Sequence, residues 1–242
     1  MNNFKLSLIG TLAMVAASWG TVINVGSEQS LQSVLDTHTL GGVSSVNVNT
    51  DQVNPDSYWS LTASGTSAAT MIIEIAGNAS TNVMGLYDMA NPANKVVLFN
   101  GAATGGTKVA VTIDGAGLVK TIDLATPALI GSATFAGNAF GYYLTGAGGT
   151  FYSDPTLNGG VDQMVSFAGK GDGFAIQLPN YATWTPDEYI LGWEDTGAGS
   201  DRDFNDMVVM VESVKPIPEP TTMGLMGLGL LGMFAAARRR KA

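Results

Sequence analysis

The sequence predicts an all-β fold, an antiparallel β-sandwich or jelly-roll-like domain, with a helical signal peptide before it and a C-terminal apolar helix after it. Short runs of β-branched and aromatic residues, separated by Gly, Asn, Asp and Pro, predict many short strands. Turn residues recur at intervals of about ten residues, as they do in sandwiches and jelly rolls. The 31 glycines among 242 residues agree with a fold that contains many tight turns.

One short helix is expected before the strands. Ser27 is its predicted N-cap, and Gly41-Gly42 is predicted to end it. Leu31, Val34 and Leu35 recur at helical spacing and form its predicted buried face. The strands are expected at Ser45–Asn49, Tyr58–Thr62, Thr70–Ala76, Val83–Asp88, Lys95–Asn100, Thr107–Ile113, Lys120–Leu124, Phe140–Thr145, Met164–Ala168, Tyr189–Glu194 and Met207–Val211.

Two of these strands are expected at the centre of a sheet. Met71–Ile75 and Met207–Val211 are nearly continuous apolar runs, which indicates strands that are covered on both faces. Met164, Met207 and Met210 are expected to fill the core.

The chain divides into four expected parts. They are a signal peptide at 1–20, an N-terminal β-rich part at 21–110, a β-domain with an acidic cluster at 111–215, and a sorting and membrane segment at 216–242. No linker between the two β-rich parts is long enough to require separate domains.

Composition excludes several classes of function. The chain has no cysteine, which excludes disulfides, iron–sulfur clusters, cysteine zinc sites and thiol catalysis. Its single histidine, His38, argues against a Ser–His triad and is expected at the surface or in a cap. Eleven Lys and Arg residues stand against 20 Asp and Glu, and several of the basic residues lie at the chain ends. Because so acidic a body repels phosphate groups, no nucleic-acid partner is expected.

The first residues are typical of a secretory signal. Lys5 precedes the apolar run Leu6–Ala17, and small residues follow at Ser18 and Gly20. The run is too short to cross the ~30 Å hydrocarbon core of a membrane. We therefore expect export through the Sec machinery.

The C-terminus combines three features in a fixed order. Pro218, Glu219 and Pro220 precede an apolar stretch at Thr221–Ala237, which is long enough to cross a bilayer. The basic residues at the end are Arg238, Arg239, Arg240 and Lys241. This order resembles the PEP-CTERM sorting signal of Gram-negative bacteria. The resemblance implies an exosortase as partner, a transient inner-membrane anchor, removal of the tail near Pro218–Pro220, and delivery to the outer surface or the exopolysaccharide matrix. An uncleaved membrane anchor is the alternative.

Acidic residues concentrate in one segment. Seven of the 20 lie between Asp187 and Asp206, where Arg202 is the one basic residue. Like charges at this density repel one another, and a bound divalent cation would relieve the repulsion. Because only oxygen ligands are present, calcium fits better than zinc or copper. The predicted calcium ligands are Glu194, Asp195, Asp201, Asp203, Asn205 and Asp206. A solvated acidic loop without an ion is the alternative.

The spacing of these residues predicts how they meet. The acids begin at the end of an expected strand, and the flexible turn Thr196–Ser200 brings the later ones back toward it. An extended segment is expected at Asp201–Asn205, because polar side chains alternate there with Arg202 and Phe204. Arg202 then points away from the ligands.

An EF-hand does not fit this segment. The position that requires glycine holds Asp206, and the following run Met207–Val211 is expected to form a strand. Such a strand places Glu212 out of reach of the ion.

The acidic segment also resembles the family of the domain of unknown function 4114. Gly192–Asp195 and Gly197–Asp206 carry the resemblance, together with the apolar strand that follows. Ala139–Leu144 and Phe151–Asn158 resemble the same family, and the likeness extends over about residues 110–212. The resemblance implies a β-rich domain of bacterial surface and secreted proteins, without an established activity.

Two classes of function are consistent with these features. The first is a secreted or surface-displayed, exosortase-sorted and calcium-stabilised structural or adhesive protein of the envelope or exopolysaccharide matrix. Under this first hypothesis the protein is not an enzyme, and its partners are exopolysaccharide or surface proteins. The second is a hydrolase of extracellular polysaccharide, with Glu194 as acid and Asp203 or Asp206 as base. The aromatic residues that would line its cleft, or else belong to the core, are Trp184, Tyr189 and Trp193.

Overall fold

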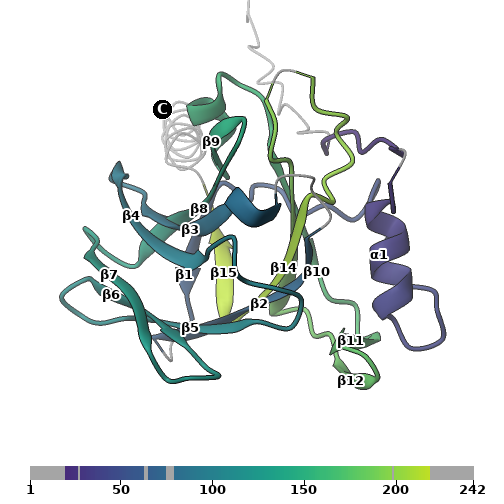
Figure 1. Cartoon of the computed structure of the whole chain (residues 1–242), viewed down its shortest axis with the longest axis horizontal. Coiled ribbons are helices and arrows are strands. Elements are labelled where there is room, and N and C mark those ends of the chain that lie inside the picture. The colour runs from purple at the N-terminus through teal and green to yellow at the C-terminus, as the bar shows by residue number, and fades with distance from the viewer. Residues whose placement is uncertain (1–19, 27, 63–64, 75–78, 198, 219–242) are drawn as a thin grey trace, which may run out of the picture.

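The computed structural model describes residues 20–26, 28–62, 65–74, 79–197 and 199–218. Two antiparallel sheets pack face to face, and one helix covers the outer side of the larger sheet (Figure 1). This arrangement confirms the predicted all-β sandwich. The expected signal-peptide helix and C-terminal apolar helix lie outside the described residues. Within the described ranges, no helix has the length and apolar character that a membrane crossing requires.

The smaller sheet has six strands. Its order is β15-β1-β8-β3-β4, and β9 pairs with β8. The strands are β1 (Tyr58–Leu61), β3 (Val83–Asp88), β4 (Asn91–Phe99), β8 (Ala139–Gly146), β9 (Gly149–Tyr152) and β15 (Val214–Ile217). The last of these, β15, is therefore an edge strand that pairs with β1 alone.

The larger sheet has seven strands in the order β10-β13-β14-β2-β5-β6-β7. The strands are β2 (Thr66–Glu74), β5 (Lys108–Ile113), β6 (Leu118–Asp123), β7 (Leu129–Thr134), β10 (Met164–Ala168), β13 (Glu188–Trp193) and β14 (Met207–Glu212). A separate hairpin joins β11 (Gly173–Gln177) to β12 (Asn180–Thr183), and two 3-10 helices lie at Ala79–Thr81 and Pro155–Asn158. Both sheets combine strands from the N-terminal part of the chain with strands from the part that follows residue 110.

The main core lies between the two sheets. It includes Trp59 and Leu61 of β1 from one side and Val209 and Val211 of β14 from the other, all of them buried. Aromatic rings dominate its centre: Trp59 makes edge contacts with Tyr142 and with Tyr189, at centroid distances of 5.8 Å and 4.9 Å. The sandwich is therefore held by apolar contacts between the facing sheets.

A second core lies on the outer face of the larger sheet. The helix α1 (Leu31–His38) packs its buried face, Leu31, Val34 and Leu35, against this sheet. Val208 and Met210 of β14 contribute to this second core, whereas Val209 and Val211 of the same strand belong to the main core between the sheets. Because β14 is buried on both faces, the prediction of a doubly covered central strand at Met207–Val211 is confirmed. The strand β2 is also central in the pairing order.

The helix agrees with its prediction except at its first residue. Ser30, rather than Ser27, is the N-cap, and its Oγ accepts a hydrogen bond from Ser33 N at 3.2 Å. Ser27 itself lies outside the described residues. After the helix, Gly41 and Gly42 adopt positive φ angles of 93° and 77°, as expected for residues that turn the chain.

The predicted strand at Ser45–Asn49 is wrong, because local hydrogen bonds fold this segment into turns. Asn47 N donates to Asp51 Oδ2 at 2.6 Å, and Asn49 N donates to Asn47 Oδ1 at 2.9 Å. Such bonds occupy backbone groups that a sheet ladder needs. Five short strands were not predicted: β7, β9, β11, β12 and β15.

Replacement of Val209 by aspartate tests the role of β14. Val209 is fully buried between the sheets, and a carboxylate there has no partner. We expect Val209→Asp to lower the free energy of unfolding by about 4 kcal/mol or more, measured by denaturant unfolding. Ser132→Asp, at an exposed position of β7, is the control and should change stability little. Similar stability for both variants would contradict the assignment of β14 to the core.

Candidate metal centre

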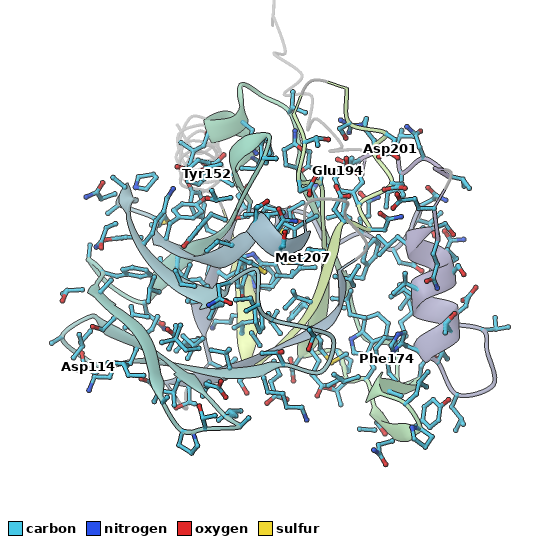
Figure 2. All side chains as sticks on the ribbon, viewed as in Figure 1. Asp114, Tyr152, Phe174, Glu194, Asp201 and Met207 are labelled. Atoms are coloured by element: carbon cyan, nitrogen blue, oxygen red, sulfur yellow. The ribbon has the colours of Figure 1, made fainter. Side chains whose placement is uncertain are left out.

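The candidate site lies in the loop that joins β13 to β14, two neighbouring strands of the larger sheet. Trp193 pairs with Met207 at the end of their ladder, so residues 194–206 leave and re-enter the sheet at the same end. Figure 2 shows Glu194 and Asp201 together at this end of the molecule, beyond Met207. The loop is thus fixed at both ends by strands in which five of six residues are buried.

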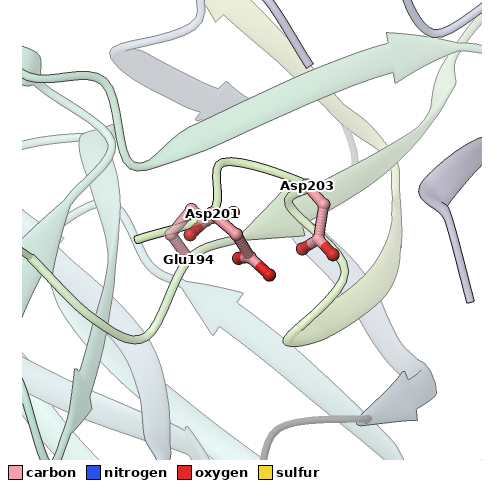
Figure 3. A group of neighbouring side chains, drawn as sticks. All are labelled: Glu194, Asp201 and Asp203. Atoms are coloured by element: carbon pink, nitrogen blue, oxygen red, sulfur yellow. The ribbon is translucent and has the colours of Figure 1, made fainter. Parts of the chain in front are cut away.

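Three acidic side chains of this loop converge. Carboxylate oxygens of Glu194, Asp201 and Asp203 lie within 4.8 Å of one another, and Figure 3 shows the three groups turned toward the same space. Glu194 and Asp203 are each 1% exposed, whereas Asp201 is exposed. The cluster therefore has two buried carboxylates and one that faces solvent.

Hydrogen bonds to Glu194 shape the loop. Its Oε1 accepts from Phe204 N at 2.6 Å, and its Oε2 accepts from Ser200 Oγ. Arg202 and Phe204 have positive φ angles of 59° and 55°. The predicted extended segment is therefore wrong, because the loop bends at both residues to bring its backbone against Glu194. The carboxylates converge through this bend and not through strand alternation.

The segment that follows the predicted signal peptide covers the cluster. Asn24 N donates to Arg202 O at 2.8 Å, and Asn24 Nδ2 donates to Asp201 O at 2.6 Å. A Cβ atom at Gly26 would lie 2.3 Å from Asp203 Oδ2, so only glycine allows the backbone to approach so closely. No role of this segment could be predicted from the sequence, because nothing in its composition indicates a contact with residues 175 or more positions away.

Asn205 connects the covering segment to the cluster. Its Nδ2 donates to Gln29 O at 2.7 Å and to Asp203 Oδ2 at 2.9 Å. Its Oδ1 is buried and has no hydrogen-bond partner among the described residues. A buried amide oxygen without a partner is costly, and it is also a suitable ligand for a hard cation.

The other two predicted ligands have different partners. Asp195 N donates to Asp206 Oδ2 at 2.8 Å, and Asp195 Oδ2 accepts from Asn82 Nδ2 at 3.0 Å. Asn82 precedes β3 in the smaller sheet, and sequence analysis did not select it. The six predicted ligands thus form two neighbouring groups. Glu194, Asp201, Asp203 and Asn205 make one group, and Asp195 and Asp206 make the other.

Burial and mutual repulsion raise the pKa of two of these acids. Burial raises the pKa of Asp203 to about 6, and the charges of Asp201 and Glu194 add to the rise. Burial also raises the pKa of Asp206 to about 7, with further contributions from Asp195, Glu194 and Asp203. The charges of the two groups are therefore coupled, and the loop holds more negative charge than its surroundings compensate.

The one basic residue of the loop does not neutralise the cluster. The Arg202 guanidinium lies 5.7 Å from the centre of the Phe204 ring, and its charge acts on Asp162. Burial raises the pKa of Asp162, and Arg202 opposes that rise. This placement leaves the convergent carboxylates without a close cationic partner among the described residues.

The structure also places the other residues that the sequence had singled out. Trp184, Tyr189 and Trp193 are buried in the two cores and do not line a cleft. Glu212 lies at the far end of β14, as expected when the EF-hand was excluded. His38 lies in the last turn of α1, and its Nδ1 is 2.6 Å from Ala175 O of β11.

Comparison with known families gives two matches. Residues 126–214 match the family described as a domain of unknown function, DUF4114. Residues 216–241 match the PEP-CTERM protein-sorting motif. The first of these parts is similar to DUF4114 domains, and a PEP-CTERM sorting signal follows it. Among curated proteins and solved structures, none matches this chain.

The DUF4114 match extends from just before β7 to the start of β15 and contains the whole acidic loop. The covering residues Asn24, Gly26 and Gln29, as well as Asn82, lie outside it. The PEP-CTERM match makes the chain an exported precursor that an exosortase sorts.

The raised pKa values predict the pH dependence of the calcium-free domain. Asp203 and Asp206 hold protons more tightly when folded than when unfolded, where an Asp titrates near about 3.9. The free energy of unfolding should therefore fall as the pH rises from about 4 to about 7. Thermal melts in chelator should show a lower melting temperature at about pH 7.5 than at about pH 5.5.

Asp206→Asn should reduce this dependence, because asparagine keeps an acceptor for Asp195 N and does not ionise. Asp187→Asn removes an exposed charge outside the cluster and should leave the dependence unchanged. An equal pH dependence in Asp206→Asn and the wild type would contradict the assignment.

Proposed function

We propose that the acidic loop binds one calcium ion and that the protein is a calcium-stabilised structural or adhesive component of the cell surface or the exopolysaccharide matrix. The observation that carries this proposal is the convergence of Glu194, Asp201 and Asp203, two of them buried, without a close cationic side chain in the part of the chain that the structure describes. Because buried carboxylates are strongly disfavoured unless they are paired, protonated or metal-bound, a cation explains why they meet.

The donor set fits a hard cation. Calcium takes 6–8 oxygen ligands, and the loop offers three convergent carboxylates. The buried Oδ1 of the neighbouring Asn205, which has no hydrogen-bond partner among the described residues, is a further candidate ligand. Backbone carbonyls and water would complete the shell. The hydrogen bonds from Phe204 N and Ser200 Oγ orient the Glu194 carboxylate and leave it further lone pairs for the ion. Asp201 provides the exposed side from which an ion would enter.

A bound ion would stabilise contacts between the acidic loop and parts of the chain that are distant in the sequence. The loop carries hydrogen bonds to Asn24 and Gln29, and the coupled pair Asp195 and Asp206 reaches Asn82 beside the smaller sheet. An exported chain without cysteine has no disulfide to supply this kind of constraint. Calcium is a suitable substitute outside the cell, where protein modules bind it with dissociation constants of about 10⁻⁴ to 10⁻³ M.

The hydrolase alternative has less support. Glu194 and Asp203 are both 1% exposed, so a sugar ring does not reach the two of them without displacing the covering segment. A cavity of about 320 Å³ lies elsewhere, between β4, β5, β6 and β7, and Asp123 of β6 is the carboxylate in its lining. Glycoside hydrolysis generally needs two such groups. Loss of saccharide turnover on Glu194→Gln remains the result that would favour the hydrolase.

Thermal melts of residues 20–217 with calcium and with chelator test the proposal. An ion that binds the folded state alone stabilises it by about 2.7 kcal/mol at a hundredfold excess over its dissociation constant. We expect a clear rise in melting temperature with calcium, and loss of most of that rise in Asp203→Asn. The neutral amide keeps the shape of the side chain but binds calcium more weakly.

Asp187→Asn is the matched control, because it removes the same charge from an exposed position in the same acidic segment. Its calcium response should equal that of the wild type. An equal loss in both variants would mean that calcium only screens the acidic surface. A melting curve that calcium and chelator leave unchanged would rule out the calcium site.

A further inference from the structure

The sorting motif begins inside the folded domain. Its match starts at residue 216, whereas β15 spans Val214–Ile217, so the last two residues of the strand belong to both. Pro218, the first residue of the Pro-Glu-Pro sequence, directly follows the strand and is exposed. No linker therefore separates the edge of the smaller sheet from the segment that the processing enzyme recognises.

The strand β15 is held by one neighbour. All four of its residues pair with β1, in the register Leu61 with Val214 through Tyr58 with Ile217. Val214 is 1% exposed and belongs to the main core, and Thr62 N donates to Ser213 O at 2.9 Å just before the strand. The chain that leads into the processing region is thus docked in the native fold.

An exosortase that grips its substrate as an extended peptide would need these residues in a different conformation from the one in the fold. A protein that grips an extended peptide does so through the backbone groups of several consecutive residues. For a bond near Pro218–Pro220, the residues on the N-terminal side are those of β15, and β1 already occupies one of their two edges. Val214 is also buried against the core. For such an enzyme, the docked strand and the enzyme-bound strand would compete.

We propose that β15 is a releasable edge strand that controls processing: it leaves β1 before the exosortase removes the tail and pairs with β1 again afterwards. Strand release precedes bond cleavage and adds no chemical step to it. The consequence is that processing is slow while β15 is docked and fast when it is free. This inference rests on the PEP-CTERM match and is independent of the calcium site.

The sequence of β15 suits a strand that opens at low cost. It is short and lies at the edge of its sheet, where local opening needs the least free energy. Pro216 has no backbone N–H and cannot donate to a ladder. Val214 is its one strongly buried side chain, so release exposes little apolar surface.

A reversible covalent lock tests the proposal in the full chain. Ser60 and Lys215 are direct partners in the register of β1 and β15. Opposed Cα atoms of an antiparallel pair lie about 4.5–5.5 Å apart, which a disulfide spans. The chain has no other cysteine, so the pair Ser60→Cys and Lys215→Cys forms one defined bond in the oxidising periplasm.

The measurement is a pulse-chase of precursor and processed chain in an exosortase-containing bacterium, with oxidised and reduced chains separated on non-reducing gels. Oxidised chains of the double variant should be processed at least about tenfold more slowly than reduced ones. The two single variants should match the wild type. A Gly/Ser linker of about six residues between Ile217 and Pro218 should restore processing of the locked chain, because the enzyme then grips the linker.

Two results would overturn the proposal. Oxidised chains processed at the wild-type rate would show that the enzyme acts on the docked strand. Locked chains that remain unprocessed with the linker would show that the bond blocks processing for another reason.

A second variant tests strand release without cysteines. Val214→Ala removes part of the contact that holds β15 in the core and should speed processing. Val209→Ala opens the same core within β14 and should leave the rate unchanged. An unchanged rate in Val214→Ala, or equal acceleration in both variants, would contradict control by β15.

Discussion

The repulsion among the carboxylates between β13 and β14 is the constraint on which the rest of the site depends. Glu194, Asp201 and Asp203 share one small space, and Asp195 and Asp206 lie close enough to act on them. Acids that are buried together raise the free energy of the folded state unless protons or a cation neutralise them. The raised pKa values of Asp203 and Asp206 favour neutralisation by protons, and calcium binding would be neutralisation by a cation.

The fold holds this loop in place from three directions. The doubly covered strand β14 and its partner β13 fix both ends of the loop. The segment around Asn24 and Gly26 covers one side with backbone, and Asn82 reaches the loop from the start of β3. The acidic loop therefore connects the N-terminal segment, the larger sheet and the smaller sheet. Its stability affects contacts between residues that are far apart in the sequence.

The elements that could be predicted from the sequence are those that follow from the local spacing of apolar residues. Apolar runs located β14 because burial on both faces needs apolar residues at every position. The helix followed from the spacing of Leu31, Val34 and Leu35. The predicted strand at Ser45–Asn49 failed because local hydrogen bonds compete with strand pairing. The side chains of Asn47 and Asp51 accept hydrogen bonds from backbone N–H groups, and the segment forms turns. The edge strand β15 was missed because it is short and contains Pro216.

The candidate site was predictable in composition but not in shape. Charge density identified its acidic residues, since no other segment holds so many. The bend at Arg202 and Phe204 was not predictable, because it depends on the hydrogen bond from Phe204 N to Glu194. The contacts of Asn24, Gly26 and Asn82 join positions that only the folded chain brings together.

Calorimetric titration of residues 20–217 with calcium tests the central claim most directly, because it counts ions and does not depend on unfolding. A single bound ion per chain is predicted, with binding lost in Glu194→Gln and retained in Asp187→Asn. No binding at millimolar calcium, or equal binding by the wild type and Glu194→Gln, would contradict the claim that the convergent carboxylates form a calcium site.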